Sequence, residues 1–156
     1  MKLSDIVCFD AVVAQLSSNR RDQVIEELVQ SLSHHKKLPA ADVKALAKAV
    51  ISRENEASTG IGKGVAVPHV KHASVPEPVA VVGCSQEGID FDSLDKQPVY
   101  SVFLLLSPTS DPDKHLQVME TIFKNLQKED FRRFLRQAQT AEAIIDVLND
   151  ADEDEH

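Results

Sequence analysis

The side chains best suited to chemistry are concentrated in the segment 53–72. This segment contains three glycines at alternate positions, Gly60, Gly62 and Gly64. Glycine frees the backbone to adopt positive φ and to point N–H groups at an anion. The apolar run that follows ends at Pro68, whose fixed φ and missing donor present His69 at the tip of a strand. The pattern predicts a phosphate-binding loop beside an accessible imidazole.

A histidine is able to carry a phosphoryl group because neutral imidazole has a nucleophilic nitrogen near pH 7. The protein must then hold the other ring nitrogen, often with a backbone carbonyl, stabilise the phosphoryl oxygens and keep water away. Candidates for the oxygens are the N–H groups of the glycine loop, the hydroxyl of Thr59 or Ser58, the guanidinium of Arg53 and the ammonium of Lys71. These residues alone leave open a glycine-rich surface turn followed by an incidental histidine.

A second histidine, His115, falls in the first turn of a helix that Asp111 caps and Pro112 opens. The positive end of the helix dipole disfavours an imidazolium and suits a neutral ring or a neighbouring anion. We expect His115 to lie within hydrogen-bond reach of His69 or its phosphoryl oxygens, because strands that end side by side bring their loops together at one sheet edge. A capping histidine without a chemical role is the alternative that the residues leave open.

Composition limits the classes of function. The 156 residues suit one domain, which we place at residues 1–149 with an acidic tail at 150–156. The net charge of −8 and the absence of Trp disfavour nucleic acid as a partner. No apolar run approaches the ~20 residues that span a bilayer, so direct membrane insertion is not expected. Cys8 and Cys84 lack metal-ligand spacing and are predicted to be buried or free thiols in the cytoplasm.

Apolar periodicity predicts alternating helices and strands. Residues 1–18 suit an N-terminal segment with an edge strand, whereas 79–84 and 99–106 suit buried strands, the second of them central. Helices are expected from the capping residues 17–19 to about His34, from Pro39 to Arg53, from Pro112 to Leu126, around 131–135, and from Thr140 to Leu148. This order predicts an α/β single domain, with a mixed β-sheet flanked by helices on both faces.

The order and spacing of these motifs resemble a known family. The residues in question are Arg53-Glu54, then Ser58 to Gly62, then Gly64 to His69, and later Gly88 to Phe91, Pro98-Val99 and His115-Leu116. They resemble the signature of the IIA components of the bacterial sugar phosphotransferase system, fructose/mannitol type, also called EIIA type 2. The likeness extends over nearly the whole chain.

The resemblance implies a phosphotransferase without cofactor or metal. In that family the histidine matching His69 takes a phosphoryl group from the phosphocarrier protein HPr or its nitrogen-branch relative, and sugar-transporting members pass it to a cysteine of a IIB domain. Residues matching Arg53, Thr59 and His115 line the same pocket. Family members commonly have a small residue after the histidine, whereas this chain has Val70, so donor recognition is expected to differ.

We therefore expect a phosphohistidine carrier standing alone, and the lack of attached IIB or IIC segments favours the nitrogen-regulatory branch over sugar transport. One alternative is an interaction module that keeps the pocket and signals only by docking to partner proteins. Another is a metal hydrolase that uses His69, His72 and His115, although no carboxylate stands at a recognised ligand spacing from them.

Overall fold

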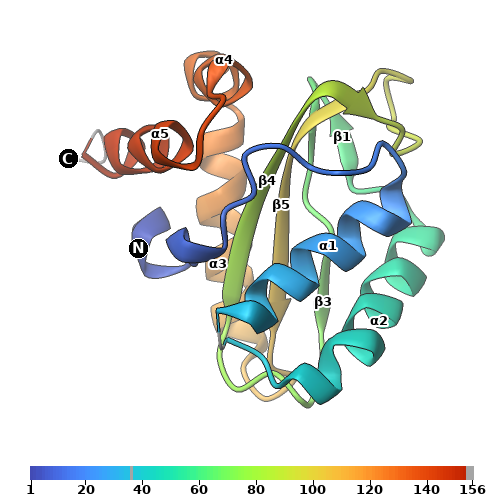
Figure 1. Ribbon diagram of the computed structural model, residues 1–156. Helices are drawn as coiled ribbons and strands as arrows, with labels where there is room; N and C mark the ends of the chain where they lie inside the picture. Colours follow the sequence, from blue (N-terminus) through green and yellow to red (C-terminus); the bar gives the residue numbers. More distant parts are fainter. Residues whose placement is uncertain (36, 154–156) are drawn as a thin grey trace.

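The computed structural model describes residues 1–35 and 37–153, which build a mixed sheet with helices on both faces (Figure 1). Its strands are β1 (Gly60–Gly62), β2 (Val65–Ala66), β3 (His69–Lys71), β4 (Val79–Ile89) and β5 (Val99–Ser107). Its α-helices are α1 (Arg21–His34), α2 (Val43–Glu56), α3 (Pro112–Leu126), α4 (Glu129–Gln137) and α5 (Ala141–Glu153). Short 3₁₀ turns occupy Leu3–Asp5, Phe9–Ala11 and Ala40–Asp42.

Strand β5 is the axis of the sheet. It pairs in parallel with β2 and β3, which follow one another along one of its edges, and antiparallel with β4 along the other edge. Strand β1 folds back on β2 as a short antiparallel hairpin. The continuous apolar run of β5 is buried on both faces, as the sequence predicts for a central strand.

Side chains of β5 alternate between two hydrophobic clusters, which are the two halves of the core. Val102, Leu104 and Leu106 pack with the apolar faces of α1 and α2, whereas Phe103 and Leu105 pack with those of α3, α4 and α5. Figure 1 shows α1 and α2 on one side of the sheet and α3 behind it. The predicted fold class is confirmed.

The residues predicted to cap the N-termini of two helices are also found in that role. A carboxylate oxygen of Asp111 accepts a hydrogen bond from the N–H of Lys114 at 3.1 Å, and Pro112 is the first residue of α3. The hydroxyl of Thr140 accepts one from the N–H of Ala143 at 3.1 Å before α5. Helices α3 and α5 therefore begin at these predicted caps.

Several boundaries differ from the sequence prediction. Helix α2 continues to Glu56, three residues beyond Arg53, because Glu54 still contributes to its buried face. Strand β4 extends through a register irregularity to Ile89, in what was expected to be a turn. The segment 1–18 forms two 3₁₀ turns instead of a strand, and only isolated bridges join Val7 and Val13 to β4.

The structure also differs from the predicted acidic tail at 150–156. Residues 150–153 belong to α5, and the rest of that predicted tail, 154–156, lies outside the described residues. Asp152 is buried, with 7% of its surface exposed. Its carboxylate accepts hydrogen bonds from the N–H groups of Leu3 at 2.6 Å and Ser4 at 3.0 Å. These donors begin a 3₁₀ turn and would otherwise lack partners, so the end of α5 fastens the N-terminus to the domain.

Cys8 and Cys84 are free and buried, as predicted, and burial raises the pKa of the Cys84 thiol to about 11. Among the described residues, no helix is long and apolar enough to cross a bilayer.

Substituting Asp152→Ala should lower the free energy of unfolding by about 1–3 kcal/mol, because it leaves two N–H groups without their acceptor. Urea denaturation followed by circular dichroism measures the change. Asp150→Ala is the matched control on the same helix, because Asp150 is exposed, and we expect it to change stability by less than about 0.5 kcal/mol. Equal effects of the two substitutions would contradict this role of Asp152.

Candidate functional site

The imidazole of His69 is held by its own backbone. Its Nδ1 atom lies 2.8 Å from the carbonyl oxygen of Val67. A carbonyl oxygen only accepts, so Nδ1 must carry the proton, and the neutral ring then has its lone pair on Nε2. His69 stands half-buried at the start of β3, and a backbone carbonyl holds its ring as expected. Its role as the nucleophile stays a prediction.

A chain of hydrogen bonds leads back from Val67 to a buried carboxylate. The N–H of Val67 donates to the carbonyl oxygen of Thr59 at 3.2 Å. Thr59 in turn donates its N–H and its hydroxyl to the two carboxylate oxygens of Glu54, each at 2.6 Å. Glu54 is only 2% exposed, so this relay ties the residue that orients His69 to helix α2.

His115 lies beside His69, as predicted. The ring centroids are 5.7 Å apart and the ring planes are inclined at 44°. His115 is buried in the first turn of α3, and its Nδ1 lies 2.7 Å from the hydroxyl oxygen of Ser107 at the end of β5. Because Nδ1 has this partner, Nε2 is the ring atom of His115 left for a ligand.

Both imidazoles are kept neutral at pH 7. Burial lowers the pKa of His69 from 6.5, and the positive charges of Arg53 and Lys71 lower it further, against the carbonyl of Val67 and the charge of Glu54, which raise it. Burial also lowers the pKa of His115 from 6.5, with contributions from His69 and Lys71. Two neutral rings surrounded by cations form an environment that suits an incoming anion.

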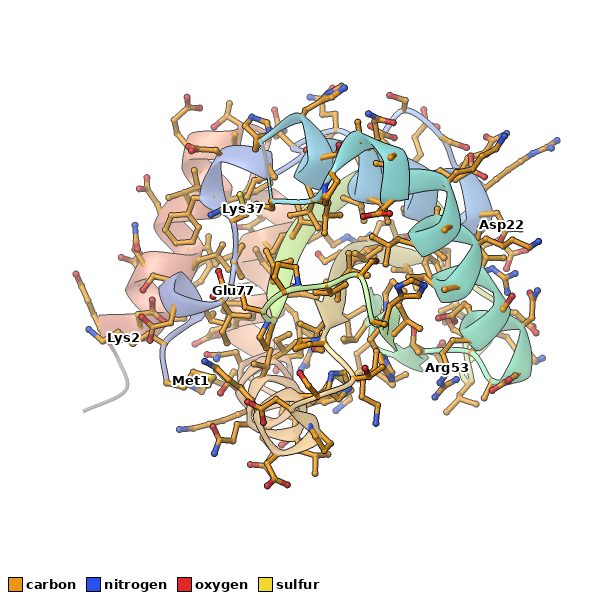
Figure 2. All side chains as sticks on the ribbon, turned by 90° about the horizontal axis from the view of Figure 1, so that it is seen from below. Met1, Lys2, Asp22, Lys37, Arg53 and Glu77 are labelled. Atoms are coloured by element: carbon orange, nitrogen blue, oxygen red, sulfur yellow. The ribbon has the colours of Figure 1, made fainter. Side chains whose placement is uncertain are left out.

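Arg53 and Lys71 provide those cations. Arg53 lies near the C-terminal end of α2 at the surface of the molecule (Figure 2) and donates one N–H to the carbonyl oxygen of Ala57 at 3.3 Å. This leaves most of its guanidinium donors for another ligand. Lys71 is exposed and stands two residues after His69 on β3, on the same face of the strand. The structure thus brings together His69, His115, Arg53 and Lys71.

Thr59 lies next to this group, but its hydroxyl proton is already donated to Glu54. The structure gives Thr59 a positioning contact, and its predicted contact with phosphate stays a prediction. Ser58 is likewise occupied, since its hydroxyl donates to the carbonyl oxygen of Phe91 at 2.7 Å.

The strand register places the hairpin turn with Gly62 and Gly64 away from His69. His69 pairs with Leu105, whereas Val65 pairs with Ser101, four positions earlier on β5, and the hairpin turn lies beyond Val65. Four strand residues span about 13 Å. Gly62 and Gly64 have φ of 100° and 79° in that turn, which explains why the chain has glycine there.

The N–H groups of the loop are also partly used. Gly60 donates to the hydroxyl of Ser58 at 3.0 Å, and Lys63 donates to the carboxylate of Asp95 at 3.1 Å. A role for Gly60, Gly62 and Gly64 as a phosphate cradle therefore stays a prediction from the sequence.

Two positioning residues were missed by the sequence reasoning. Glu54 continues the buried stripe of Leu46, Ala47 and Val50 on α2, and an acid on an apolar stripe is a signal that it has a buried partner. Ser107 ends the apolar run of β5, but nothing in the sequence connects its hydroxyl with His115.

Metal binding was the alternative chemistry. Among residues 1–35 and 37–153, no group of three or more His, Cys, Asp or Glu side chains is arranged to hold a metal ion. The Nδ1 atom of His72 lies 2.8 Å from the hydroxyl oxygen of Ser74.

Comparisons with known proteins identify the family of the chain. Residues 8–151 match the family described as phosphoenolpyruvate-dependent sugar phosphotransferase system, EIIA 2. The chain is 35% identical to the fructose-specific EIIABC component of Bacillus subtilis, in a match that covers 97% of this chain and 24% of that protein. It is 29% identical to a nitrogen regulatory protein of Pseudomonas aeruginosa, with 96% of both chains covered.

Solved structures show the same fold. The nitrogen regulatory protein IIA-Ntr of Neisseria meningitidis superimposes with a TM-score of 0.82 at 28% identity, over 94% of this chain and 98% of that one. Mannitol IIA of Escherichia coli, solved in complex with phosphorylated mannitol IIB, gives a TM-score of 0.74 at 16% identity, over 90% of this chain and 95% of that one.

Both histidines should titrate below pH 6.5 when followed by NMR of the ring nitrogens, because burial and nearby cations disfavour their charged forms. Lys71→Gln should raise both pKa values, since it removes a cation that acts on both rings, whereas the exposed Lys48→Gln on α2 should change neither.

The same shifts predict a pH dependence of folding. The unfolded chain binds these protons near pH 6.5 and the folded chain only at lower pH, so the stability from neutral His69 and His115 is complete above pH 6.5. It should decline as the pH falls through the folded-state pKa values. Titration of either ring at or above 6.5 would contradict the site electrostatics described here.

Proposed function

We propose that this chain, which belongs to the EIIA type 2 family of the phosphoenolpyruvate-dependent sugar phosphotransferase system, carries a phosphoryl group on Nε2 of His69. The observation that supports this most directly is the 2.8 Å contact between Nδ1 of His69 and the carbonyl oxygen of Val67. It leaves Nε2 as the nucleophile of a neutral, oriented ring.

In the proposed step, the lone pair of Nε2 attacks the phosphorus of a phosphorylated donor protein. The bond from Nε2 to phosphorus forms as the bond to the donor nitrogen breaks, and the electron pair of that bond returns to the donor. The Nδ1 proton stays in its hydrogen bond to Val67, whose carbonyl dipole stabilises the positive charge that the ring acquires. No proton needs to leave His69 during transfer.

The surrounding groups stabilise the phosphoryl oxygens. The N-terminal turn of α3 offers its dipole, and His115 offers a ring N–H, since a ring that accepts at Nδ1 from Ser107 carries its proton on Nε2. Arg53 offers a planar guanidinium, and Lys71 adds a point charge. These groups hold most strongly when charge builds up on the oxygens, in the transition state of transfer.

The donor is an HPr-type phosphocarrier, and the acceptor is a IIB domain or a regulatory target protein. The solved complex of mannitol IIA with phosphorylated IIB supports the first kind of acceptor. Similarity to nitrogen regulatory proteins over almost their full length supports the second, in which the phosphorylated state of His69 serves as a signal. A module that only docks to partners without accepting phosphate is the alternative function.

Incubation with a phosphorylated HPr-type donor tests the function. We expect one phosphoryl group per chain that is acid-labile and base-stable, with the Nε2 linkage in NMR, and none in His69→Ala, since that variant lacks the nucleophile. His72→Ala is the matched control and should be phosphorylated at the normal rate. Unchanged phosphorylation of His69→Ala would refute the assignment, and a wild-type chain that binds the donor but gains no phosphate would support the docking module.

His115→Ala should still accept the phosphoryl group but transfer it onward far more slowly, because it loses one hydrogen bond to a developing anion, worth about 2–4 kcal/mol. His115→Asn should keep part of the rate, since an amide is also a neutral donor. Single-turnover transfer from the phosphorylated variants to a IIB domain gives the rates. Onward transfer at the wild-type rate from His115→Ala would remove His115 from the reacting group.

A further inference from the structure

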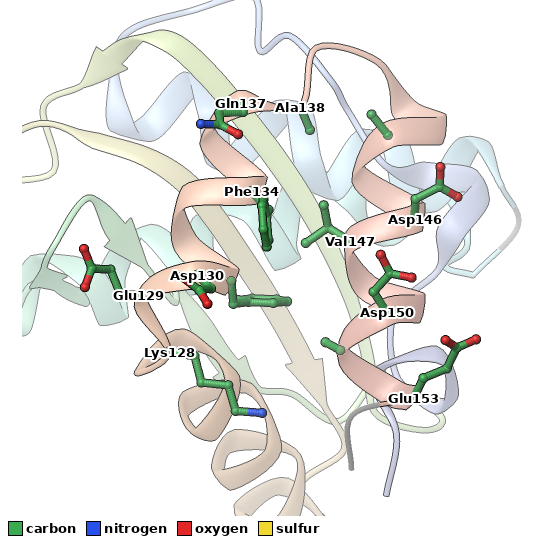
Figure 3. A pocket seen from close by; sticks show the side chains of 13 residues that line it. Lys128, Glu129, Asp130, Phe134, Gln137, Ala138, Asp146, Val147, Asp150 and Glu153 are labelled. Carbon is green, nitrogen blue, oxygen red and sulfur yellow. The ribbon is translucent and has the colours of Figure 1, made fainter. Parts of the chain in front are cut away.

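A groove between α4 and α5 lies far from His69, at the opposite end of the molecule from β3 (Figure 1). It encloses about 830 Å³. Phe131, Phe134 and Val147 contribute its large apolar side chains, and three alanines complete its floor. Figure 3 shows Phe134 and Val147 pointing toward one another from the two helices.

The apolar lining is exposed to solvent at Phe134, whereas Phe131, Ala138 and Ala151 are buried. Phe134 leaves 48% of its surface exposed, although a phenylalanine ring gains stability mainly through burial. The apolar residues recur at helical spacing on both walls, at 131 and 134 on α4 with 138 directly after it, and at 143, 147 and 151 on α5. A lengthwise apolar strip between two helices has the shape that receives a third helix.

Three carboxylates follow one side of this strip. Asp146, Asp150 and Glu153 stand at positions i, i+4 and i+7 of α5 and project from it in Figure 3. Helix α5 contains five acidic residues and no lysine or arginine. Within the described part of the chain, no hydrogen bond or ion pair occupies these three side chains.

Two of these acids stand where their negative charge lowers the stability of the helix. Asp150 and Glu153 stand in the last part of α5, where the helix dipole favours cations and destabilises negative charge. Asp152 in the same turn is compensated by the N–H groups of Leu3 and Ser4, whereas no group among the described residues compensates Asp150 or Glu153. Acids that stand against the helix dipole without an internal partner are typical of residues that serve an external partner.

The remaining charges at the rim leave the field negative. The lining also includes the acids Glu129 and Asp130 and the cation Lys128. Asp130 is also paired with Arg133 at 2.9 Å. The carboxylates of α5 therefore dominate the electrostatics, and a basic occupant is the one whose charge complements them.

We propose that this groove docks a basic amphipathic helix of a partner protein. A large apolar side chain of that helix packs between Phe134 and Val147, and its lysines or arginines pair with Asp146, Asp150 and Glu153. The acids are spaced about 6 and 4.5 Å along the helix axis, which matches cations at i, i+4 and i+7 of a helix lying alongside. The surface is separate from His69 and does not depend on its phosphorylation.

The test uses the full chain and a synthetic peptide of about 18 residues, long enough to form a helix, with leucine at three- and four-residue spacing and lysine at the flanking positions. A scrambled peptide of the same composition is the control for amphipathicity. Binding is measured by calorimetry and mapped by ¹H–¹⁵N chemical shifts. We expect the amphipathic peptide to bind with shifts concentrated on α4 and α5, and the scrambled peptide to bind much more weakly.

Two pairs of variants separate docking from general attraction. Phe134→Ala should weaken binding about tenfold, whereas Leu94→Ala, which removes another exposed apolar side chain, should not. Neutralising Asp146, Asp150 and Glu153 to their amides should weaken binding and flatten its salt dependence. Neutralising the exposed Glu26, Glu56 and Glu87 changes the net charge equally and should have little effect.

Equal losses from the two triple neutralisations would overturn the proposal, because they would show attraction by net charge alone. Shifts centred away from α4 and α5, or unchanged affinity of Phe134→Ala, would also overturn it. Sedimentation of the free chain tests whether a second copy of the chain occupies the groove. A dimer that Phe134→Ala abolishes would assign the groove to that second copy. Phosphorylation of His69 should stay normal in every one of these variants, so a failure here is distinct from a failure of the phosphocarrier function.

Discussion

The hydrogen bond from Nδ1 of His69 to the carbonyl oxygen of Val67 is the constraint on which the candidate site depends. It decides which nitrogen has the lone pair, and it fixes the direction in which that lone pair points. The carbonyl is itself held in place, because the N–H of Val67 is bound by Thr59 and Thr59 is bound by the buried carboxylate of Glu54. Through these hydrogen bonds, the buried Glu54 on α2 helps to orient the imidazole of His69, which lies in a different layer of the fold.

Strand β5 brings together His69 and His115, which are 46 positions apart in the sequence. Its parallel pairing with β3 sets His69 against Leu105, and its last residue, Ser107, precedes the helix that carries His115. Ser107 then acts at both sides of the site. Its carbonyl accepts from the N–H of His72 after β3, and its hydroxyl contacts His115. A central strand that is buried on both faces gives both rings the same rigid reference.

Much of this arrangement could be predicted from the sequence, because strong periodicity and capping residues fix the helices and the apolar run of β5 fixes the centre of the sheet. His69 and His115 were predicted together for the same reason. The glycine loop shows where such reasoning ends: Gly62 and Gly64 are explained by a hairpin turn, and glycine spacing alone does not distinguish a turn from an anion cradle. Ser107 escaped prediction because its function arises from a tertiary contact with His115, which no local pattern records.

The two ends of the molecule differ in how their charged side chains are placed. Around His69, neutral rings stand among cations, so the folded chain avoids placing like charges together and still favours an anion. On α5, by contrast, acids accumulate toward the helix end that least tolerates them, and within residues 1–35 and 37–153 only Asp152 has a pair of internal donors. Because uncompensated charge lowers stability in the free chain, a difference of this kind between two surfaces reflects two different demands. The surface around His69 suits a small anion and the groove between α4 and α5 suits a larger basic partner, and the two lie at opposite ends of the molecule (Figure 1).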